Sequence, residues 1–270
     1  MNIAGPILYY YYDNMYMFGG NRLLMFGEMH GQRACTQPHT FCITDLLLKQ
    51  MKEHKHSTYF FLEGSAEMTY RPTKSPTMKD LAIKLENNSH VIRELEYIYA
   101  YYSMFPKIDY NNVHHMIDNI NEMKQSRIQL YQIDQNLAMQ LDAFINGFLI
   151  PYYNSMKVEE TLRSGCILRD IHLITSLLIK LLTKQNIIIL MYYGAGHMYV
   201  VHKFFEWIGI MPHAFDDSQY SMRQSDPNYE PPGCIHGVYY PHLTNQHYGF
   251  PGYIHGAYYP QLMPPLFIAH

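Results

Sequence analysis

Residues 187–193 read IIILMYY and are followed at once by Gly-Ala-Gly-His at 194–197. An unbroken apolar run of this length that stops at a glycine is typical of a strand buried on both faces, as in a parallel sheet. The preceding residues, Leu162–Leu182, space their apolar side chains as a helix does. Val200–Ile208 is also expected to be helical. This stretch therefore predicts a buried strand between two helices.

The N-terminal half repeats this alternation. Arg22–Phe26 (RLLMF) is strand-like and stops at Gly27, Thr40–His54 has an apolar helical face, and Thr58–Leu62 (TYFFL) is strand-like again. Strand, turn, helix and strand begin a βαβ unit, so we expect an α/β fold with a mainly parallel open sheet flanked by helices. Arg127–Ile133 (RIQLYQI) alternates and is predicted to be a further strand.

The domain boundaries follow changes in composition. Residues 1–18 hold a tyrosine run and are expected to be an N-terminal arm or an edge strand, and 19–212 form the α/β domain, with a helical excursion at about 80–125. Residues 213–270 are predicted to be an extended tail rich in Tyr, Pro and His. Within the tail, GCIHGVYYPHL (Gly233–Leu243) recurs as GYIHGAYYPQL (Gly252–Leu262). The repeat reflects either low-complexity packing or self-association or partner contact through the tail.

Composition limits the partners. The chain has 270 residues and a net charge of −3, with basic residues scattered along it, which argues against nucleic acid or an anionic membrane as the main partner. No apolar stretch reaches the roughly 20 residues that span a bilayer. The four cysteines include no Cys-x-x-Cys pair, so free thiols are expected. A cytoplasmic location is therefore expected.

Polar side chains with acid–base chemistry follow the predicted strands. Glu28 and His30 come after the first strand, Glu63 after the second, Asp134 after the third and His197 after the last. The carboxyl ends of parallel strands share one edge of a sheet, where ligand sites form. Histidine and carboxylate groups there favour proton transfer or a divalent metal. For Asp134, a helix N-cap before Asn136–Leu141 is the alternative.

Glycines surround these positions. Gly27, Gly31, Gly194 and Gly196 are expected to permit sharp turns with positive φ, so that backbone approaches a substrate closely.

Gly-Glu-x-His-Gly at 27–31 and Gly-Ala-Gly-His at 194–197 resemble the superfamily that contains erythromycin esterases, ChaN-like haem-binding proteins and the TraB/Tiki group. Glu63 in FFLEG, Asp134 in YQID and the Arg169-Asp170 pair before the last strand add to the resemblance. It covers roughly residues 19–212.

The resemblance implies different activities for different members. In the Tiki group the paired motifs are associated with metal-dependent peptide cleavage, the esterases open a lactone with His and Glu activating water, and the ChaN-like proteins bind haem. It implies that His30 and His197 are bases or metal ligands, Glu28 a base or ligand, and Glu63 a second carboxylate. Arg169 would orient a carboxylate or stabilise an oxyanion.

These observations predict a hydrolase that cleaves an ester, lactone or peptide bond in a small-molecule or peptide substrate. A divalent metal (Zn, Mn, Fe or Co) held by His30, His197 and Glu63 is one version of this site. Two alternatives are a non-catalytic protein that binds haem or another ligand, and an interaction or assembly protein whose site is degenerate. The pairs His54/His56 and His114/His115 resemble chelators but lie in polar helical or loop contexts.

Overall fold

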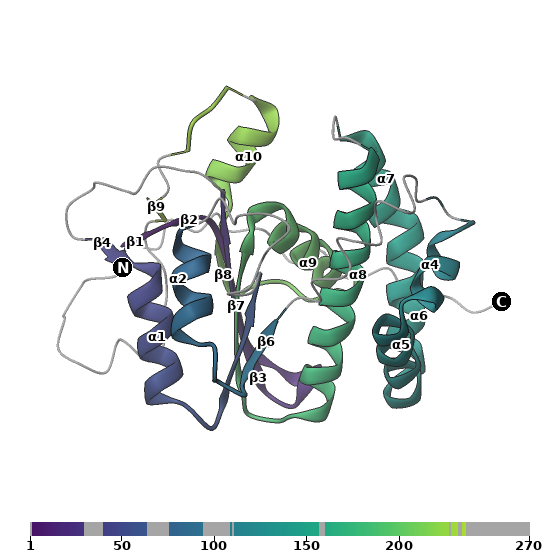
Figure 1. The fold of residues 1–270 in the computed structure, drawn as a ribbon, viewed down its shortest axis with the longest axis horizontal. Coiled ribbons are helices and arrows are strands. Elements are labelled where there is room, and N and C mark those ends of the chain that lie inside the picture. Colours follow the sequence, from purple (N-terminus) through teal and green to yellow (C-terminus); the bar gives the residue numbers. More distant parts are fainter. Residues whose placement is uncertain are drawn as a thin grey trace. The chain divides into compact units, whose positions relative to one another are not determined.

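The strand predicted from the run at 187–193 is β7 (Ile188–Gly194), which lies inside a mixed sheet in the computed structural model (Figure 1). The structure describes residues 2–29, 40–63, 76–93, 109, 111–156, 160–226, 228–231 and 234–235. All of them belong to one compact unit, Met1–Tyr239. Within these residues the main sheet has the strand order β6-β5-β7-β3-β2-β8, and a smaller sheet has the order β4-β1-β9.

The strands of the main sheet are β2 (Pro6–Met15), β3 (Asn21–Glu28), β5 (Thr58–Leu62), β6 (Val91–Arg93), β7 and β8 (Ala214–Asp216). The strands of the smaller sheet are β1 (Asn2–Ala4), β4 (Thr40–Cys42) and β9 (Cys234–Ile235). β6, β5, β7 and β3 are parallel to one another, whereas β2 pairs antiparallel with both β3 and β8. The predicted α/β fold with a mainly parallel sheet is confirmed.

Helices cover both faces of the main sheet (Figure 1). The helices are α1 (Ile43–Glu53), α2 (Pro76–Lys84), α4 (Val113–Asn119), α5 (Asn121–Ile133), α6 (Gln135–Phe144), α7 (Ile150–Ser155), α8 (Glu160–Thr183), α9 (Ala195–Trp207) and α10 (Ser218–Ser225), with a 3-10 turn η1 (Tyr16–Phe18) and a π-helical turn η2 (Ile145–Leu149). α1 and α2 lie on one side, α8 lies on the other, and α4–α7 lie beyond α8. None of the described helices is long and apolar enough to cross a membrane.

Residues of β7 alternate between the two faces. Met191 and Tyr193 belong to the large hydrophobic core on the α8 and α9 side. Tyr192 points to the opposite face, where α1 lies. Its hydroxyl is 3.5 Å from the position that a Cβ on Gly5 would occupy, and Ile43 of α1 lies beside the same position. All residues of β7 are buried. The continuous apolar run is explained by burial on both faces.

The N-terminal tyrosine run forms an interior strand. β2 pairs with β3 on one side and with β8 on the other, and Tyr9–Tyr12 are all buried. Tyr12 packs on Phe205 of α9, whereas Tyr9 packs on Phe26. The prediction of an arm or edge strand at 1–18 was wrong, because tyrosines can fill both faces of a covered sheet.

The predicted tail boundary was also wrong. β8 extends the main sheet, α10 packs beside β2, and β9 pairs with β1, so part of the segment 213–235 belongs to the α/β unit. Residues 236–270 lie outside the described part of the chain.

The helical excursion predicted at about 80–125 is described only in part. Helices follow one another from α4 to α7, Val91–Arg93 forms β6, and residues 94–108 lie outside the described part of the chain. Arg127–Ile133 belongs to helix α5, so the predicted strand there was wrong. The buried residues of α5, Met123 and Leu130, are seven residues apart, which is a helical spacing. The predicted strand Arg127–Ile133 contains only Leu130, so the spacing cannot be seen within it.

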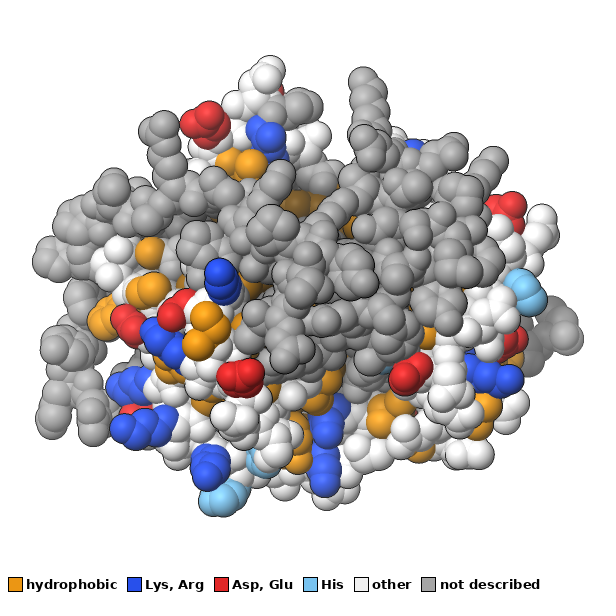
Figure 2. Space-filling view, viewed as in Figure 1, with side chains coloured by type: hydrophobic (Ala, Val, Ile, Leu, Met, Phe, Trp, Pro, Cys, Tyr) orange, Lys and Arg blue, Asp and Glu red, His pale blue; other side chains and the backbone are white. Residues whose placement is uncertain are grey.

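Charged side chains are interspersed on the surface that Figure 2 shows, where lysine and arginine alternate with acidic residues. This distribution agrees with the small net charge of −3.

Candidate functional site

Three strand ends bring the expected polar residues to one edge of the sheet. Glu28 ends β3 and lies opposite Gly194, which ends β7, and Glu63 follows directly after β5. The Glu63 N–H donates to the Tyr192 carbonyl, 3.1 Å away, so β5 and β7 remain joined to this point. The parallel order of these strands is what places these residues together.

Glu63 is a buried link between two strands and a helix. One carboxylate oxygen accepts a hydrogen bond from Arg169 of α8, and the other accepts from the Gly194 N–H at 2.5 Å. Both Glu63 and Arg169 are buried. Because the guanidinium compensates the carboxylate, this pair can remain charged away from water.

His197 lies in the first turn of α9 and is held by Asp170 of α8. Its Nδ1 lies 2.6 Å from Asp170 Oδ1, and the Tyr153 hydroxyl donates to Asp170 Oδ2 at 2.6 Å. Asp170 is completely buried. An ionised carboxylate only accepts hydrogen bonds, so Nδ1 carries a proton and Nε2 of a neutral His197 is the basic nitrogen.

Opposing effects act on the His197 imidazole. Burial lowers the pKa of His197, whereas the charge and hydrogen bond of Asp170 and the charge of Glu63 raise it, and Arg169 opposes them. The net result is a raised pKa. The carboxylates therefore stabilise the imidazolium that forms when Nε2 takes up a proton.

His197 lines a small pocket with mixed lining. Its Nε2 lies 3.9 Å from Glu63 Oε1. The pocket is lined by Phe61, Ile92, Arg169, Asp170, His172, Leu173, Ser176, Tyr193 and His197. The space between these side chains has room for about one water molecule. The arrangement combines one base, one guanidinium and an apolar wall.

Glu28 lies on the other face of the sheet. Its Oε2 accepts a hydrogen bond of 2.5 Å from the Tyr192 hydroxyl, on the side of α1. Burial, and then the Glu28 charge, raise the pKa of Tyr192 well above its ordinary value. The structure thus brings Glu63, Arg169 and His197 together and places Glu28 across the sheet from them.

The described part of the chain does not place every expected site residue. His30 and Gly31 lie outside the described residues. Asp134 is described, and it caps α6 by accepting from the Leu137 N–H at 2.9 Å. Its predicted position at a strand end was wrong, and the N-cap alternative is confirmed, because α5 rather than a strand precedes it.

The expected reason for three glycines was also wrong. Gly27, Gly194 and Gly196 do not have positive φ. A Cβ on Gly27 would meet the Ala195 Cα and the Leu8 Cγ, each at 2.7 Å. Gly27 is therefore required by the close packing of β3 against the start of α9.

The described donors do not fit a metal held by Glu63. Both Glu63 oxygens already accept hydrogen bonds, and the positive Arg169 would repel a cation placed there. In the described ranges no three His, Cys, Asp or Glu side chains are grouped to hold an ion, including those around His54, His56, His114 and His115. The third expected ligand, His30, is outside these ranges.

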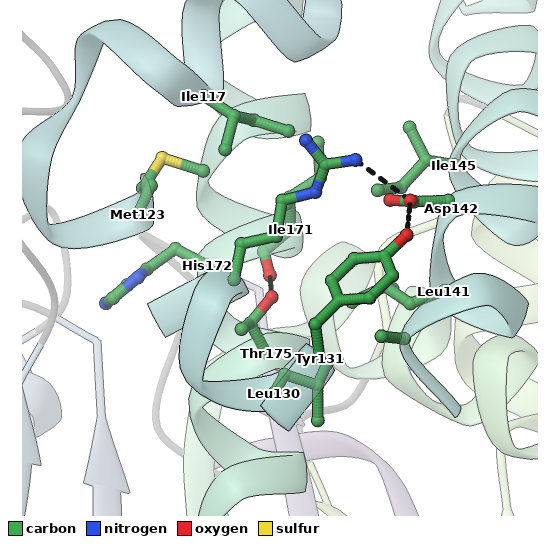
Figure 3. Close-up of a pocket in the computed structure, with 12 residues that line it drawn as sticks. Ile117, Met123, Leu130, Tyr131, Leu141, Asp142, Ile145, Ile171, His172 and Thr175 are labelled. Atoms are coloured by element: carbon green, nitrogen blue, oxygen red, sulfur yellow. Dashed lines mark hydrogen bonds and ion pairs between the residues drawn. The ribbon is translucent and has the colours of Figure 1, made fainter. Parts of the chain in front are cut away.

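A second pocket lies between α5, α6 and α8. Figure 3 shows the Tyr131 hydroxyl directed at Asp142, to which it donates at 2.5 Å, and Arg127 pairs with the same carboxylate at 2.9 Å. His172 lines this pocket and also the pocket beside His197. Burial lowers the pKa of His172 to about 4, so it is neutral at pH 7. The contacts of Arg127 and Tyr131 with Asp142 join α5 to α6.

Sequence reasoning missed Tyr153 and the partnership of Asp170 with His197. Asp170 was recognised only beside Arg169, and its position on a helix gave no indication that it faces a strand end. Comparison with known proteins gave no relative, since no family model, no curated protein and no solved structure matches the chain.

Proposed function

We propose that the chain is a hydrolase of ester, lactone or peptide bonds in which His197 is the general base. The observation that supports this most is the buried Asp170–His197 pair, which lines a pocket together with Arg169. An imidazole oriented by a buried carboxylate is a recurring arrangement for proton transfer in acyl transfer.

The chemistry needs one water and one carbonyl substrate. Nε2 takes a proton from the water as the water oxygen attacks the carbonyl carbon, and negative charge develops on the carbonyl oxygen. The Arg169 guanidinium stabilises this charge, and Asp170 stabilises the imidazolium. As the bond to the leaving oxygen or nitrogen breaks, the imidazolium returns the proton to it.

The supporting residues hold these groups in place. Tyr153 fixes Asp170 by its hydrogen bond, so Oδ1 remains directed at His197. Glu63 holds Arg169 and joins it to the Gly194 backbone. Pre-organisation of this kind lowers the reorganisation needed during the reaction.

The motif resemblance also supports the proposal. We propose that residues 19–212 are related to the superfamily of erythromycin esterases, ChaN-like proteins and the TraB/Tiki group. The positions of Glu63, Arg169 and His197 agree with the layout that the resemblance implies. The position of Glu28 departs from it, and we therefore assign no step to Glu28.

The test compares His197→Gln and Asp170→Asn with wild type on nitrophenyl esters, lactones and a fluorogenic peptide library. Each protein is assayed after metal ions have been removed with a chelator and again after Zn²⁺ or Mn²⁺ has been added. We expect kcat/KM to fall by about 10² to 10⁴ for His197→Gln, in the range of a lost general base. His202→Gln is the matched control, because His202 is buried in the same helix but contacts Tyr12.

Two results would contradict the proposal. One is turnover by His197→Gln that equals that of His202→Gln. The other is the absence of wild-type turnover for all three substrate classes under every metal condition. If activity is found only after a metal is added, the protein is still a hydrolase, but its reaction uses a metal ion and the metal-free mechanism given above is wrong.

A further inference from the structure

The pocket beside His197 has a second histidine in its wall, His172 of α8. The His172 Nε2 lies 3.4 Å from the Ser176 hydroxyl, and Ser176 lines the same pocket. The His172 Nδ1 is shielded from solvent and has no hydrogen-bond partner among the described residues. A buried polar atom is costly unless water or a ligand satisfies it, so the unpartnered Nδ1 indicates a binding position.

The ring of His172 is turned away from the polar cluster of the other pocket that it lines. Figure 3 shows it directed away from Tyr131 and Asp142. The Asp142 carboxylate already accepts hydrogen bonds from Tyr131 and Arg127, so that cluster does not need His172 as a partner. The pocket beside His197 is thus the place where His172 can meet a ligand.

The protonation of His172 suits a carbonyl group. Burial lowers the pKa of His172 to about 4, so the ring is uncharged at pH 7 and carries one proton. When the Ser176 hydroxyl donates to Nε2, this proton is on Nδ1, which is then a hydrogen-bond donor. The pocket has room for about one water molecule, and a carbonyl oxygen is of similar size.

The charges around the pocket disfavour an anion. While the general base is neutral, the carboxylates of Glu63 and Asp170 exceed the Arg169 guanidinium by one negative charge. The charge of Glu122 acts on His172 as well and raises its pKa. The rest of the wall is mainly apolar and includes Phe61, Ile92 and Leu173. A carbonyl compound without charge therefore fits this pocket better than a carboxylate does.

We infer that His172 binds the carbonyl oxygen of an uncharged substrate through a hydrogen bond from Nδ1. Arg169, which the proposed mechanism assigns to the charge on the same oxygen, is the second group that stabilises it. The role of His172 rests on the proposed function and narrows its substrates to esters, lactones or amides whose acyl group carries no charge.

Three substitutions at one position test which ring nitrogen matters. His172→Asn keeps an N–H near the place of Nδ1, His172→Gln keeps a polar group near the place of Nε2, and His172→Phe keeps neither. On nitrophenyl acetate we expect kcat/KM to fall by about ten- to a hundredfold for His172→Gln and His172→Phe, as for one hydrogen bond to an oxygen that gains charge. His172→Asn should stay close to wild type, whereas a general packing defect would lower all three variants.

A binding measurement that needs no turnover separates this role from the proposed hydrolysis. The full-length chain is labelled with ¹⁵N-histidine, and the ring signals of His172 are those that His172→Phe removes. We expect these signals to report a proton on Nδ1 and to shift when acetamide is added. Acetate, an anion of nearly the same size, should leave them unchanged.

Four results would overturn the role of His172. They are a ring proton on Nε2, no shift with acetamide, an equal shift with acetate, and a loss in His172→Asn that equals the loss in His172→Gln. Turnover that depends on His197 but is unchanged in all three His172 variants would overturn it and leave the hydrolase standing. Acetamide binding at His172 in a chain that hydrolyses no ester would support the binding role and contradict only the proposed hydrolysis.

Discussion

At the scale of single residues, one missing methyl group sets how closely β3 approaches α9. Gly27 has ordinary strand geometry, yet a Cβ there would come within 2.7 Å of the Ala195 backbone. Gly196, in the first turn of α9, would meet only the Tyr220 hydroxyl at 3.6 Å. The two glycines therefore have different requirements, although both were expected to allow backbone to approach a substrate.

We predict that Gly27→Ala lowers the free energy of unfolding by about 1 to 3 kcal/mol, because the clash is with backbone. Gly196→Ala should leave it unchanged or raise it by up to about 1 kcal/mol, since alanine favours a helix. Urea denaturation of both variants measures the difference. Equal effects at the two positions would show that close packing does not explain Gly27.

A second prediction concerns His202, whose Nδ1 lies 2.9 Å from the Tyr12 hydroxyl and whose ring stacks on Tyr10. Burial lowers the pKa of His202 to about 4, from 6.5. The folded state therefore favours the neutral ring, and unfolding takes up a proton below pH 6.5. The stabilisation is present above pH 6.5 and is lost as pH falls towards 4.

Between pH 7 and pH 5 we expect the stability advantage of wild type over His202→Gln to shrink by about 1 to 2 kcal/mol. Denaturation curves at the two pH values measure it. His172, which has a similarly lowered pKa, is present in both chains and cancels. A constant difference between the chains would contradict the assignment.

At the scale of elements, the sequence predicted best where burial is continuous. β5 and β7 match the predicted strands to within one residue at either end, because both contain an unbroken apolar run that stops at a polar residue or glycine. β2 was misjudged because four tyrosines give no alternation when both faces are covered. The strand predicted at 127–133 failed because a short amphipathic helix segment can alternate by chance.

The N-cap at Asp134 gives the element-scale prediction. Its carboxylate accepts from the Leu137 N–H and so compensates the unpaired start of α6. Asp134→Ala should lower the free energy of unfolding by about 1 kcal/mol, whereas Asp134→Asn, which keeps an acceptor, should change it by a few tenths. Thermal and urea unfolding measure both. Loss of hydrolytic activity in the alanine variant with unchanged stability would instead favour the original site role.

At the scale of the whole molecule, strand order explains which parts of the site were predictable. Glu63 and His197 follow strands that the sequence identified, so their shared edge could be inferred. Glu28 follows such a strand too, but the side of the sheet that it faces depends on which helices cover each face. Asp170 and Tyr153 come from α8 and α7, and nothing local in the sequence shows that these helices converge on His197.

The C-terminal end of the folded unit is also a property of the whole molecule, and truncated chains test where it lies. Removing residues 213–270 deletes β8 and β9, and with them the hydrogen bond from the Tyr10 hydroxyl to Asp217 and the cover that Ile235 gives to Ile3. Removing only residues 240–270 deletes no contact among the described residues, all of which precede position 240.

We expect the longer truncation to lower the free energy of unfolding by at least about 3 kcal/mol, on the order of the burial lost from Tyr10 and Ile3. The shorter truncation keeps every described residue, so it should lower the free energy of unfolding by less than the longer truncation does. Urea denaturation followed by far-ultraviolet circular dichroism measures both chains. If the longer truncation is as stable as the full chain, residues 1–212 would be sufficient for the fold, because pairing of β8 and β9 would then contribute nothing to it.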